Sequence, residues 1–198
     1  STLIKILAGV YKMDSGKILV EGRPVDISSP RQAQEHGISV VHQEFTLVPQ
    51  MTVAENIMLS NMPSIPGLRS LVDKKTMVYE SEKILNGLGV DIDVFAPVRL
   101  LTMAEQQIVE IAKALSGKTR ILVMDEPTAA LSNVEVERLF DVIRTLILKG
   151  IAVIYISHKL EEVFRISHRI TVLRDGRVVS SGHVLSSGVN CRRDSPRN

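Results

Sequence analysis

The stretch Arg120–Thr128 constrains the fold more than any other part of this chain. It reads Arg-Ile-Leu-Val-Met-Asp-Glu-Pro-Thr, so a run of apolar residues leads directly into two adjacent carboxylates. A short apolar run bounded by polar and turn-forming residues is typical of a strand buried on both faces, as in a parallel sheet covered by helices. The stretch therefore predicts an α/β fold in which Asp125 and Glu126 stand at the carboxyl end of a central strand.

A second apolar run, Ile151–Ile156, repeats this plan and ends in Ser157 and His158. Ligands of open α/β sheets bind outside the carboxyl ends of the strands. Each run taken alone is equally explained as a core strand that ends in ordinary polar loop residues. Taken together, and with the first residues of the chain, the two runs predict one shared site.

The first residues are Ser1 and Thr2, followed by an apolar segment that predicts a short helix ended by Gly9. In the motif G-x-x-x-x-G-K-[ST], backbone N–H groups and the lysine hold phosphates, and the hydroxyl coordinates Mg²⁺. The hydroxyl end of this motif is present in the sequence, so we expect the chain to begin inside it. Ser1 is then a metal ligand, and Thr2 opens a helix whose N-terminus favours phosphate. A plain helix cap is the alternative.

Size and composition narrow the class of protein. The 198 residues suit one domain with a proper core, divided into two lobes at most. A net charge of +2 gives no electrostatic reason to expect nucleic acid. The single cysteine, Cys191, excludes an internal disulfide and fits a reducing compartment. No apolar run approaches the roughly 18–20 residues that span a bilayer, so a membrane role is expected to come through a partner.

The rest of the chain alternates predicted strands and helices. Strands are expected at Lys17–Val20 and Ile38–His42, with a turn at Glu21–Pro24 and a helix at Pro30–Glu35. Helical spacing at 53–59, 74–88 and 104–115 predicts an inserted helical lobe, with a proline-containing loop at 60–73. A further amphipathic helix is predicted at 134–148.

The C-terminal part carries a hairpin pattern. Asp175-Gly176 lies between two β-branched runs, which favours a tight turn with positive φ, and the hairpin is expected to close the sheet. Beyond it, the Ser-, Gly- and Arg-rich residues up to Asn198 lack periodicity and predict a disordered tail.

Six short motifs, in this order and spacing, resemble those of the ATP-binding cassette ATPases, and more closely those of bacterial carbohydrate importers of the ribose/galactose type. The resemblance extends from Ser1 to about Val179. The motifs are Ser1–Leu3, Val41–Glu44, Met51–Ile57, Glu110–Leu115, Met124–Thr128 and Ile156–Glu162.

The resemblance implies an α/β fold with a P-loop NTPase-like core, a mostly parallel sheet and an inserted helical subdomain. The implied domains are a nucleotide-binding core at 1–44 and 117–183, incomplete at its N-terminus, a helical and signature subdomain at 45–116, and a disordered tail at 184–198.

The resemblance also implies the site residues. Asp125 resembles the carboxylate that holds the Mg²⁺ shell, and Glu126 resembles the general base that polarises the water attacking the γ-phosphate. Gln43 resembles the glutamine that touches both the metal and this water, and His158 resembles the histidine that contacts the γ-phosphate. Ser1 completes the implied metal ligands, and ATP and Mg²⁺ are the implied cofactors. Taken singly, each residue also fits a structural role.

The segment Leu101–Gln107 lies where the family has its signature sequence, Leu-Ser-Gly-Gly-Gln, which opens a helix that faces the ATP of a second cassette. Thr102 keeps the hydroxyl and Ala104 keeps a backbone N–H, so both are expected to contact that ATP. Two positions depart from the family. Glu105 replaces a neutral residue and brings negative charge near a triphosphate, and Ser132 stands where many relatives have an aspartate that contacts the other cassette.

The implied function is the ATP-binding subunit of a bacterial sugar importer, an ATPase whose hydrolysis drives transport through a membrane permease. The implied partners are a second cassette, permease subunits and, indirectly, a periplasmic sugar-binding protein, with no nucleic acid. The implied location is peripheral, at the cytoplasmic face of the inner or plasma membrane. Because the sequence contains no phosphate-loop glycines or lysine, weak ATP binding and no activity are expected of the chain alone.

Two alternatives stay open. One is a non-catalytic interaction module that persists through its helical lobe, and the other is a soluble cassette ATPase of DNA repair or translation. The sequence before Leu101 carries no long coiled-coil insertion and no charged linker run, the features expected of the second alternative.

Overall fold

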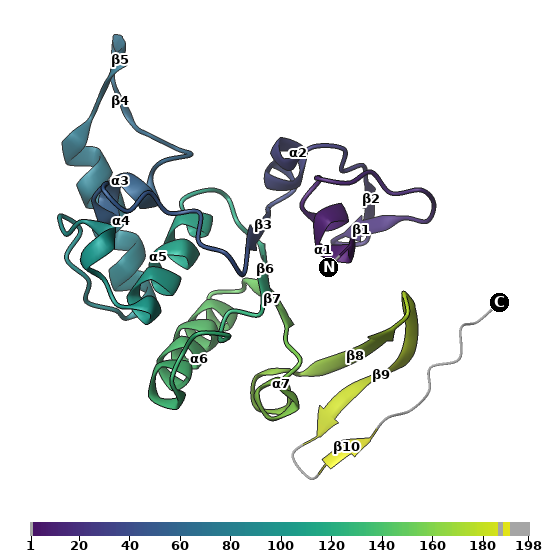
Figure 1. The fold of residues 1–198 in the computed structure, drawn as a ribbon. Helices are drawn as coiled ribbons and strands as arrows, with labels where there is room; N and C mark the ends of the chain where they lie inside the picture. Colours follow the sequence, from purple (N-terminus) through teal and green to yellow (C-terminus); the bar gives the residue numbers. More distant parts are fainter. Residues whose placement is uncertain (1, 186–187, 191–198) are drawn as a thin grey trace. The chain divides into compact units, whose positions relative to one another are not determined.

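Figure 1 shows a computed structural model of the chain, which describes residues 2–185 and 188–190. The chain divides into two compact units, Ser1–Ile154 and Tyr155–Asn198. This division falls within the second predicted core segment, 117–183, and not at the predicted limits of the helical lobe. The domain boundaries at 44/45 and 116/117 therefore stay a prediction.

The first unit opens with helix α1 (Thr2–Leu7), which confirms the short helix predicted before Gly9. Gly9 has a φ of 70°, and a Cβ atom at this position would lie 2.3 Å from the carbonyl oxygen of Ser29. Ser29 caps helix α2 (Pro30–Glu35) by accepting a hydrogen bond from the Gln32 N–H. Glycine is therefore required where the chain leaving α1 passes the start of α2.

A small hairpin separates these two helices. Strand β1 (Ile18–Val20) pairs antiparallel with β2 (Arg23–Val25). Glu21 and Gly22 both have positive φ, at 53° and 76°, so two residues complete the turn. The sequence had placed Arg23 and Pro24 in this turn, and the structure corrects that assignment by starting the second strand at Arg23.

The central sheet has the order β3-β6-β7. Its strands are β3 (Ile38–Val41), β6 (Ile121–Asp125) and β7 (Ala152–Ile156), and β3 and β6 run parallel. The middle residues of β6 are fully buried, which confirms the prediction made from its apolar run. Parallel pairing belongs to this sheet, whereas the other sheets of the described chain are antiparallel.

Helix α6 (Asn133–Leu148) follows β6 and supplies much of the core. Its apolar face contributes side chains that are 3% exposed or less, namely Leu139, Phe140, Val142, Ile143 and Leu146. The periodicity that predicted this helix therefore identified the buried face correctly.

Between β3 and β6 the chain forms the predicted helical lobe. Its helices are α3 (Val53–Ile57), α4 (Lys74–Leu88) and α5 (Met103–Leu115), with a short 3₁₀ helix, η1 (Val98–Leu100), before α5. Helix α3 packs against both α4 and α5. The predicted loop before α4 is a hairpin instead, formed by β4 (Ser64–Ile65) and β5 (Leu68–Val72) around Gly67, which has a φ of 83°. Gly67 supplies the positive φ of the turn that joins these strands.

The second unit contains helix α7 (Leu160–Ile166) and a sheet of order β10-β9-β8. Strand β8 (Arg169–Arg174) and strand β9 (Arg177–Leu185) form the hairpin predicted at Asp175-Gly176, whose φ values are 50° and 74°. The hairpin lies in this separate sheet, so the expectation that it closes the central sheet is wrong: β9 takes β10 as its second partner.

The predicted tail also needs correction where it is described. Strand β9 continues to Leu185, and β10 (Gly188–Asn190) pairs with it antiparallel, with Val189 opposite Val184. Backbone pairing with an existing strand requires no apolar periodicity, which is why composition did not reveal these residues. The remainder of the predicted tail, 186–187 and 191–198, lies outside the described residues.

Candidate functional site

Two of the predicted site segments follow neighbouring parallel strands. Val41, the last residue of β3, is opposite Met124 of β6, and Asp125 ends β6. Parallel strands that are in register end at the same edge of the sheet. The fold therefore brings Gln43, two residues after β3, to the edge at which Asp125 and Glu126 leave the sheet.

Glu126 adopts an unusual backbone conformation. Its φ is 47°, in the left-handed region that non-glycine residues rarely occupy. Such a residue costs on the order of 1–3 kcal/mol, and strain of this kind clusters at functional sites. Asp125 and Glu126 are both half-buried, and the Glu126 carbonyl accepts a hydrogen bond of 3.2 Å from the Ala129 N–H.

The segment after Gln43 is anchored by Asn56 of α3, a residue that is completely buried. The Asn56 Oδ1 accepts a hydrogen bond of 2.7 Å from the Val48 N–H, and its Nδ2 donates at 3.0 Å to the Val48 carbonyl. Nδ2 also lies 3.0 Å from the carbonyl oxygen of Thr52. A buried amide that replaces backbone partners in this way holds an irregular segment in one conformation.

The predicted signature residues lie at the start of α5, in the helical lobe. Thr102 is the N-cap residue and forms a capping box with Glu105. The Thr102 N–H and hydroxyl both donate to the Glu105 Oε2, at 2.8 and 2.9 Å, and the Glu105 N–H donates to the Thr102 Oγ1 at 3.3 Å. Ala104 follows in the first turn, with its side chain buried. Glu105 therefore caps the N-terminus of α5, where a negative charge is favourable.

Ser132, the other departure from the family pattern, has a similar position. It precedes α6, and its N–H and hydroxyl donate to the Glu135 Oε2 at 2.8 and 2.6 Å. These hydrogen bonds, that of the hydroxyl first, hold the pKa of Glu135 below its usual value.

His158 belongs to the second unit, between β7 and α7. In the same loop, the Lys159 N–H donates to the Ser157 Oγ at 3.0 Å. Glu162 of α7 is buried and accepts a hydrogen bond of 2.8 Å from the Tyr155 hydroxyl. It also pairs with the Lys159 ammonium at 3.1 Å. These contacts order the turn on both sides of His158.

The N-terminal site residues are described only in part. Thr2 is the first residue of α1 and is exposed, in agreement with its predicted position at the start of a helix. Ser1, the predicted metal ligand, lies outside the described residues.

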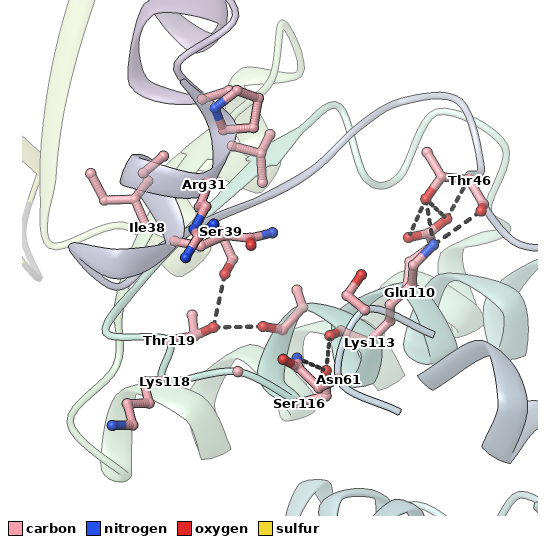
Figure 2. A pocket seen from close by; sticks show the side chains of 18 of the residues that line it. Arg31, Ile38, Ser39, Thr46, Asn61, Glu110, Lys113, Ser116, Lys118 and Thr119 are labelled. Atoms are coloured by element: carbon pink, nitrogen blue, oxygen red, sulfur yellow. Dashed lines mark hydrogen bonds between the residues drawn. The ribbon is translucent and has the colours of Figure 1, made fainter. Parts of the chain in front are cut away.

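A cavity of about 930 Å³ lies in the first unit, against α2, β3 and the C-terminal end of α5 (Figure 2). Its polar lining includes Ser39 and Thr119, whose hydroxyls are 2.8 Å apart, and Asn61, which donates to Ser116 at 3.0 Å. The predicted site residues of the described chain are not part of its lining. The lining does contain Thr46, Glu110 and Lys113, which sequence reasoning did not identify as functional. Glu110 lies in one of the six family-like motifs, but its burial on α5 is seen only in the structure.

Two general properties concern metals and membranes. Within the described ranges, no group of three or more His, Cys, Asp or Glu side chains is arranged to hold a metal ion. Across residues 2–185 and 188–190, none of the helices has the length and apolar character needed to cross a bilayer.

Comparison with known proteins decides the family. Residues 1–129 match the family described as ABC transporter. The chain belongs to the ABC transporter family. Family membership confirms the resemblance inferred from the six motifs.

Its curated relatives in this family include ribose import proteins. The chain is 48% identical over 184 residues to the ribose import ATP-binding protein RbsA of Clostridium perfringens (strain SM101), covering 93% of this chain and 36% of the relative. It is 52% identical over 179 residues to the ribose import ATP-binding protein RbsA 1 of Rubrobacter xylanophilus, covering 90% of this chain and 35% of the relative. The chain thus spans about a third of the length of these relatives.

Solved ABC cassettes share the fold. The ADP conformation of MJ1267, an ATP-binding cassette of an ABC transporter, superposes with a TM-score of 0.80 at 25% identity. The match covers 92% of this chain and 74% of that structure. A dimeric bacterial ABC transporter cassette, MJ0796, gives a TM-score of 0.73 at 21% identity, over 93% of this chain and 80% of that structure. The predicted α/β cassette fold is therefore confirmed.

Proposed function

We propose that this chain is the greater part of one nucleotide-binding cassette of a bacterial sugar importer, whose ATP hydrolysis drives transport through a membrane permease. The observation that carries the proposal is the edge of the central sheet, where β3 leads to Gln43 and β6 leads to Asp125 and Glu126. The extensive identity to ribose import ATP-binding proteins supports the same class of substrate, a pentose or related sugar.

The residues at this edge suit a magnesium-nucleotide complex. Carboxylate and amide oxygens are hard ligands, and Mg²⁺ at nucleotide sites is held by one or two carboxylates together with phosphate oxygens. Asp125 and Gln43 would hold the metal, with Ser1 as a further ligand. When bound, the metal neutralises charge on the β- and γ-phosphates. Thr2 would contribute the start of α1 to the phosphate site.

Glu126 is the proposed general base. Its backbone conformation differs from that of Asp125, since its φ of 47° lies in the left-handed region, and we assign the two neighbouring carboxylates to different partners. Glu126 would accept a proton from the attacking water, and Gln43 would orient that water through its side-chain amide. His158 would donate a hydrogen bond to the γ-phosphate and stabilise the charge that develops there.

We place the chain in a larger assembly. Thr102 and Ala104 would contact the ATP bound by a second cassette, as the dimeric arrangement named for a cassette of the same fold suggests. Permease subunits would be direct partners, and a periplasmic sugar-binding protein would act on them from the other side. The proposed location is peripheral, at the cytoplasmic face of the inner membrane.

A graft tests the proposal. Residues of this chain would replace the matching 184-residue stretch of the Clostridium perfringens ribose import ATP-binding protein. The hybrid is expected to hydrolyse ATP, and Glu126→Gln is expected to lower kcat by about a hundredfold or more, the scale of lost acid–base catalysis. Glu82→Gln, an exposed glutamate of α4, is the matched control. A folded hybrid without activity, or one indifferent to Glu126→Gln, would remove the basis of the proposal.

The isolated chain gives a second test. Its sequence carries neither the phosphate-loop glycines nor the lysine, and each charge-assisted phosphate contact is worth roughly 1.5–3 kcal/mol. We expect no hydrolysis above that of its own Glu126→Gln variant. Turnover above this background would contradict the expected dependence of hydrolysis on a phosphate loop.

A further inference from the structure

Thr46, three residues after Gln43, is bound to α5 through each of its hydrogen-bonding groups (Figure 2). Its N–H donates to the Glu110 Oε1, and its hydroxyl donates to the same oxygen at 2.9 Å. The Lys113 ammonium donates to the Thr46 carbonyl at 3.0 Å and to its Oγ1 at 2.9 Å. We call these three residues the Thr46 latch.

Glu110, the acidic residue of the Thr46 latch, is buried and therefore needs hydrogen-bond donors. Glu110 is only 6% exposed, although it is a carboxylic acid on a helix whose neighbouring residues, Val109 and Ile111, are completely buried. A buried acid is unfavourable unless hydrogen-bond donors meet it. Thr46 supplies two such donors, so docking of the segment onto α5 and burial of Glu110 stabilise each other.

The latch also completes the attachment of the segment that contains Gln43. Upstream, Val41 belongs to β3 of the central sheet, and downstream, Val48 is held by Asn56. Gln43–Phe45 therefore extend from the sheet edge to a fixed point on the helical lobe. The position of Gln43 depends on where α5 places Thr46.

Helix α5 also begins next to Thr102, one of the predicted signature residues. Thr102 caps its N-terminus, and Glu110 lies eight residues later, which corresponds to about 12 Å along the helix axis at 1.5 Å per residue. Both positions belong to one continuous helical element, because Thr102 is the N-cap of the 13-residue helix that contains Glu110. The proposed contact with a second cassette and the proposed metal-site glutamine are thus connected through one element.

We propose that Glu110 and Lys113 are positioning residues that hold the Gln43 segment to α5, the helix that Thr102 caps. The inference deepens the proposed function, on which the roles of Gln43 and Thr102 rest. The latch itself is a property of the folded chain without nucleotide.

Hydrogen exchange in the 198-residue chain, measured without nucleotide, tests the latch directly. Thr46→Val keeps the shape of the side chain but removes the hydroxyl, and is expected to speed exchange of the residue-46 amide, which donates to Glu110, by about tenfold, the loss of one charge-assisted hydrogen bond. Thr46→Ser restores the hydroxyl and is expected to restore the parent rate. Thr76→Val is the matched control, because it removes a hydroxyl of α4 that donates to Asp73, the N-cap residue of that helix, at 2.7 Å. It is expected to leave exchange of the residue-46 amide unchanged.

The role of Glu110 as the acceptor for Thr46 is tested by Glu110→Gln. Alone, Glu110→Gln is expected to speed exchange of the same amide. Combined with Thr46→Val, it is expected to give less than the product of the two single effects, since both changes weaken one interaction. Parent-like exchange in Thr46→Val, failure of Thr46→Ser to restore it, or equal acceleration throughout α5 would each overturn the proposal. Because no ATP is present, failure of the proposed function leaves these results unaffected.

Discussion

Replacement of Asn56 by alanine is the sharpest test of how the Gln43 segment is stabilised. The side chain of Asn56 is fully buried on α3. It accepts from the Val48 N–H at 2.7 Å and donates to the carbonyls of Val48 and Thr52, both at 3.0 Å. Alanine removes these three hydrogen bonds, together with a longer one of 3.3 Å from Nδ2 to the Met51 carbonyl, and leaves the Val48 N–H without its acceptor.

The structure sets the magnitude. Each hydrogen bond contributes about 0.5–1.5 kcal/mol net, and a buried donor left without a partner costs about 1–3 kcal/mol. Asn56→Ala is therefore expected to lower the free energy of unfolding by about 3–4 kcal/mol, a large part of the roughly 5–15 kcal/mol typical of a domain. Asn61→Ala is the matched control, because Asn61 makes an exposed hydrogen bond of 3.0 Å to Ser116. It is expected to cost about 0.5 kcal/mol.

Urea denaturation followed by circular dichroism measures both variants. With an m-value of about 2 kcal/mol/M, Asn56→Ala is expected to lower the midpoint by about 1.5–2 M, and Asn61→Ala by about 0.25 M. Unchanged m-values would confirm that both variants unfold from a similarly compact state. Equal midpoints for the two variants would refute the reasoning, since burial and the number of hydrogen bonds would then make no difference.

Three further predictions follow from backbone and capping geometry. Glu126→Gly relieves the left-handed φ of 47° and is expected to raise the free energy of unfolding by up to about 1 kcal/mol in urea denaturation; a loss of stability would argue against strain there. Gly9→Ala directs a Cβ against the Ser29 carbonyl oxygen and is expected to destabilise the chain by about 2 kcal/mol or more, so an unchanged melting temperature would count against the close approach. Because the Ser132 hydroxyl lowers the pKa of Glu135, the resulting stabilisation is complete above the ordinary glutamate pKa and is lost as the pH falls through the lower folded-state value. Ser132→Ala is expected to move the ¹³C titration midpoint of Glu135 upward, and an unmoved midpoint would exclude the cap as the cause.

Local patterns were sufficient for the parts of the fold that depend on burial of one face. The apolar run of β6 and the periodicity of α6 both located buried residues, because hydrophobic spacing directly reflects packing. The β4–β5 hairpin was missed for the opposite reason. Its pairing depends on contacts across a turn that contains Pro66 and Gly67, residues that indicate a loop when they are considered alone.

Some features of the candidate site were likewise predictable from the sequence, and others were not. Asp125 was placed at a strand end because an apolar run can be located from sequence, whereas Gln43 was identified only through the family resemblance. The parallel register of β3 with β6, which the structure adds, relates the two positions. The positive φ of Glu126 was not foreseen, since a glutamate has no intrinsic preference for the left-handed region. The contact between Thr46 and Glu110 joins residues 64 positions apart, so no local pattern records it.

The capping box at Thr102 has a consequence for assembly. An anion that arrives at the start of α5 meets donors already occupied by the Glu105 carboxylate, which is tethered only three residues away. A tethered competitor acts at an effective concentration in the millimolar range or above. If the start of α5 contacts the ATP of a second cassette, as proposed, the triphosphate must replace the Glu105 carboxylate as the acceptor of these hydrogen bonds. The equilibrium of association would then depend on how much more strongly the triphosphate binds the Thr102 donors than Glu105 does.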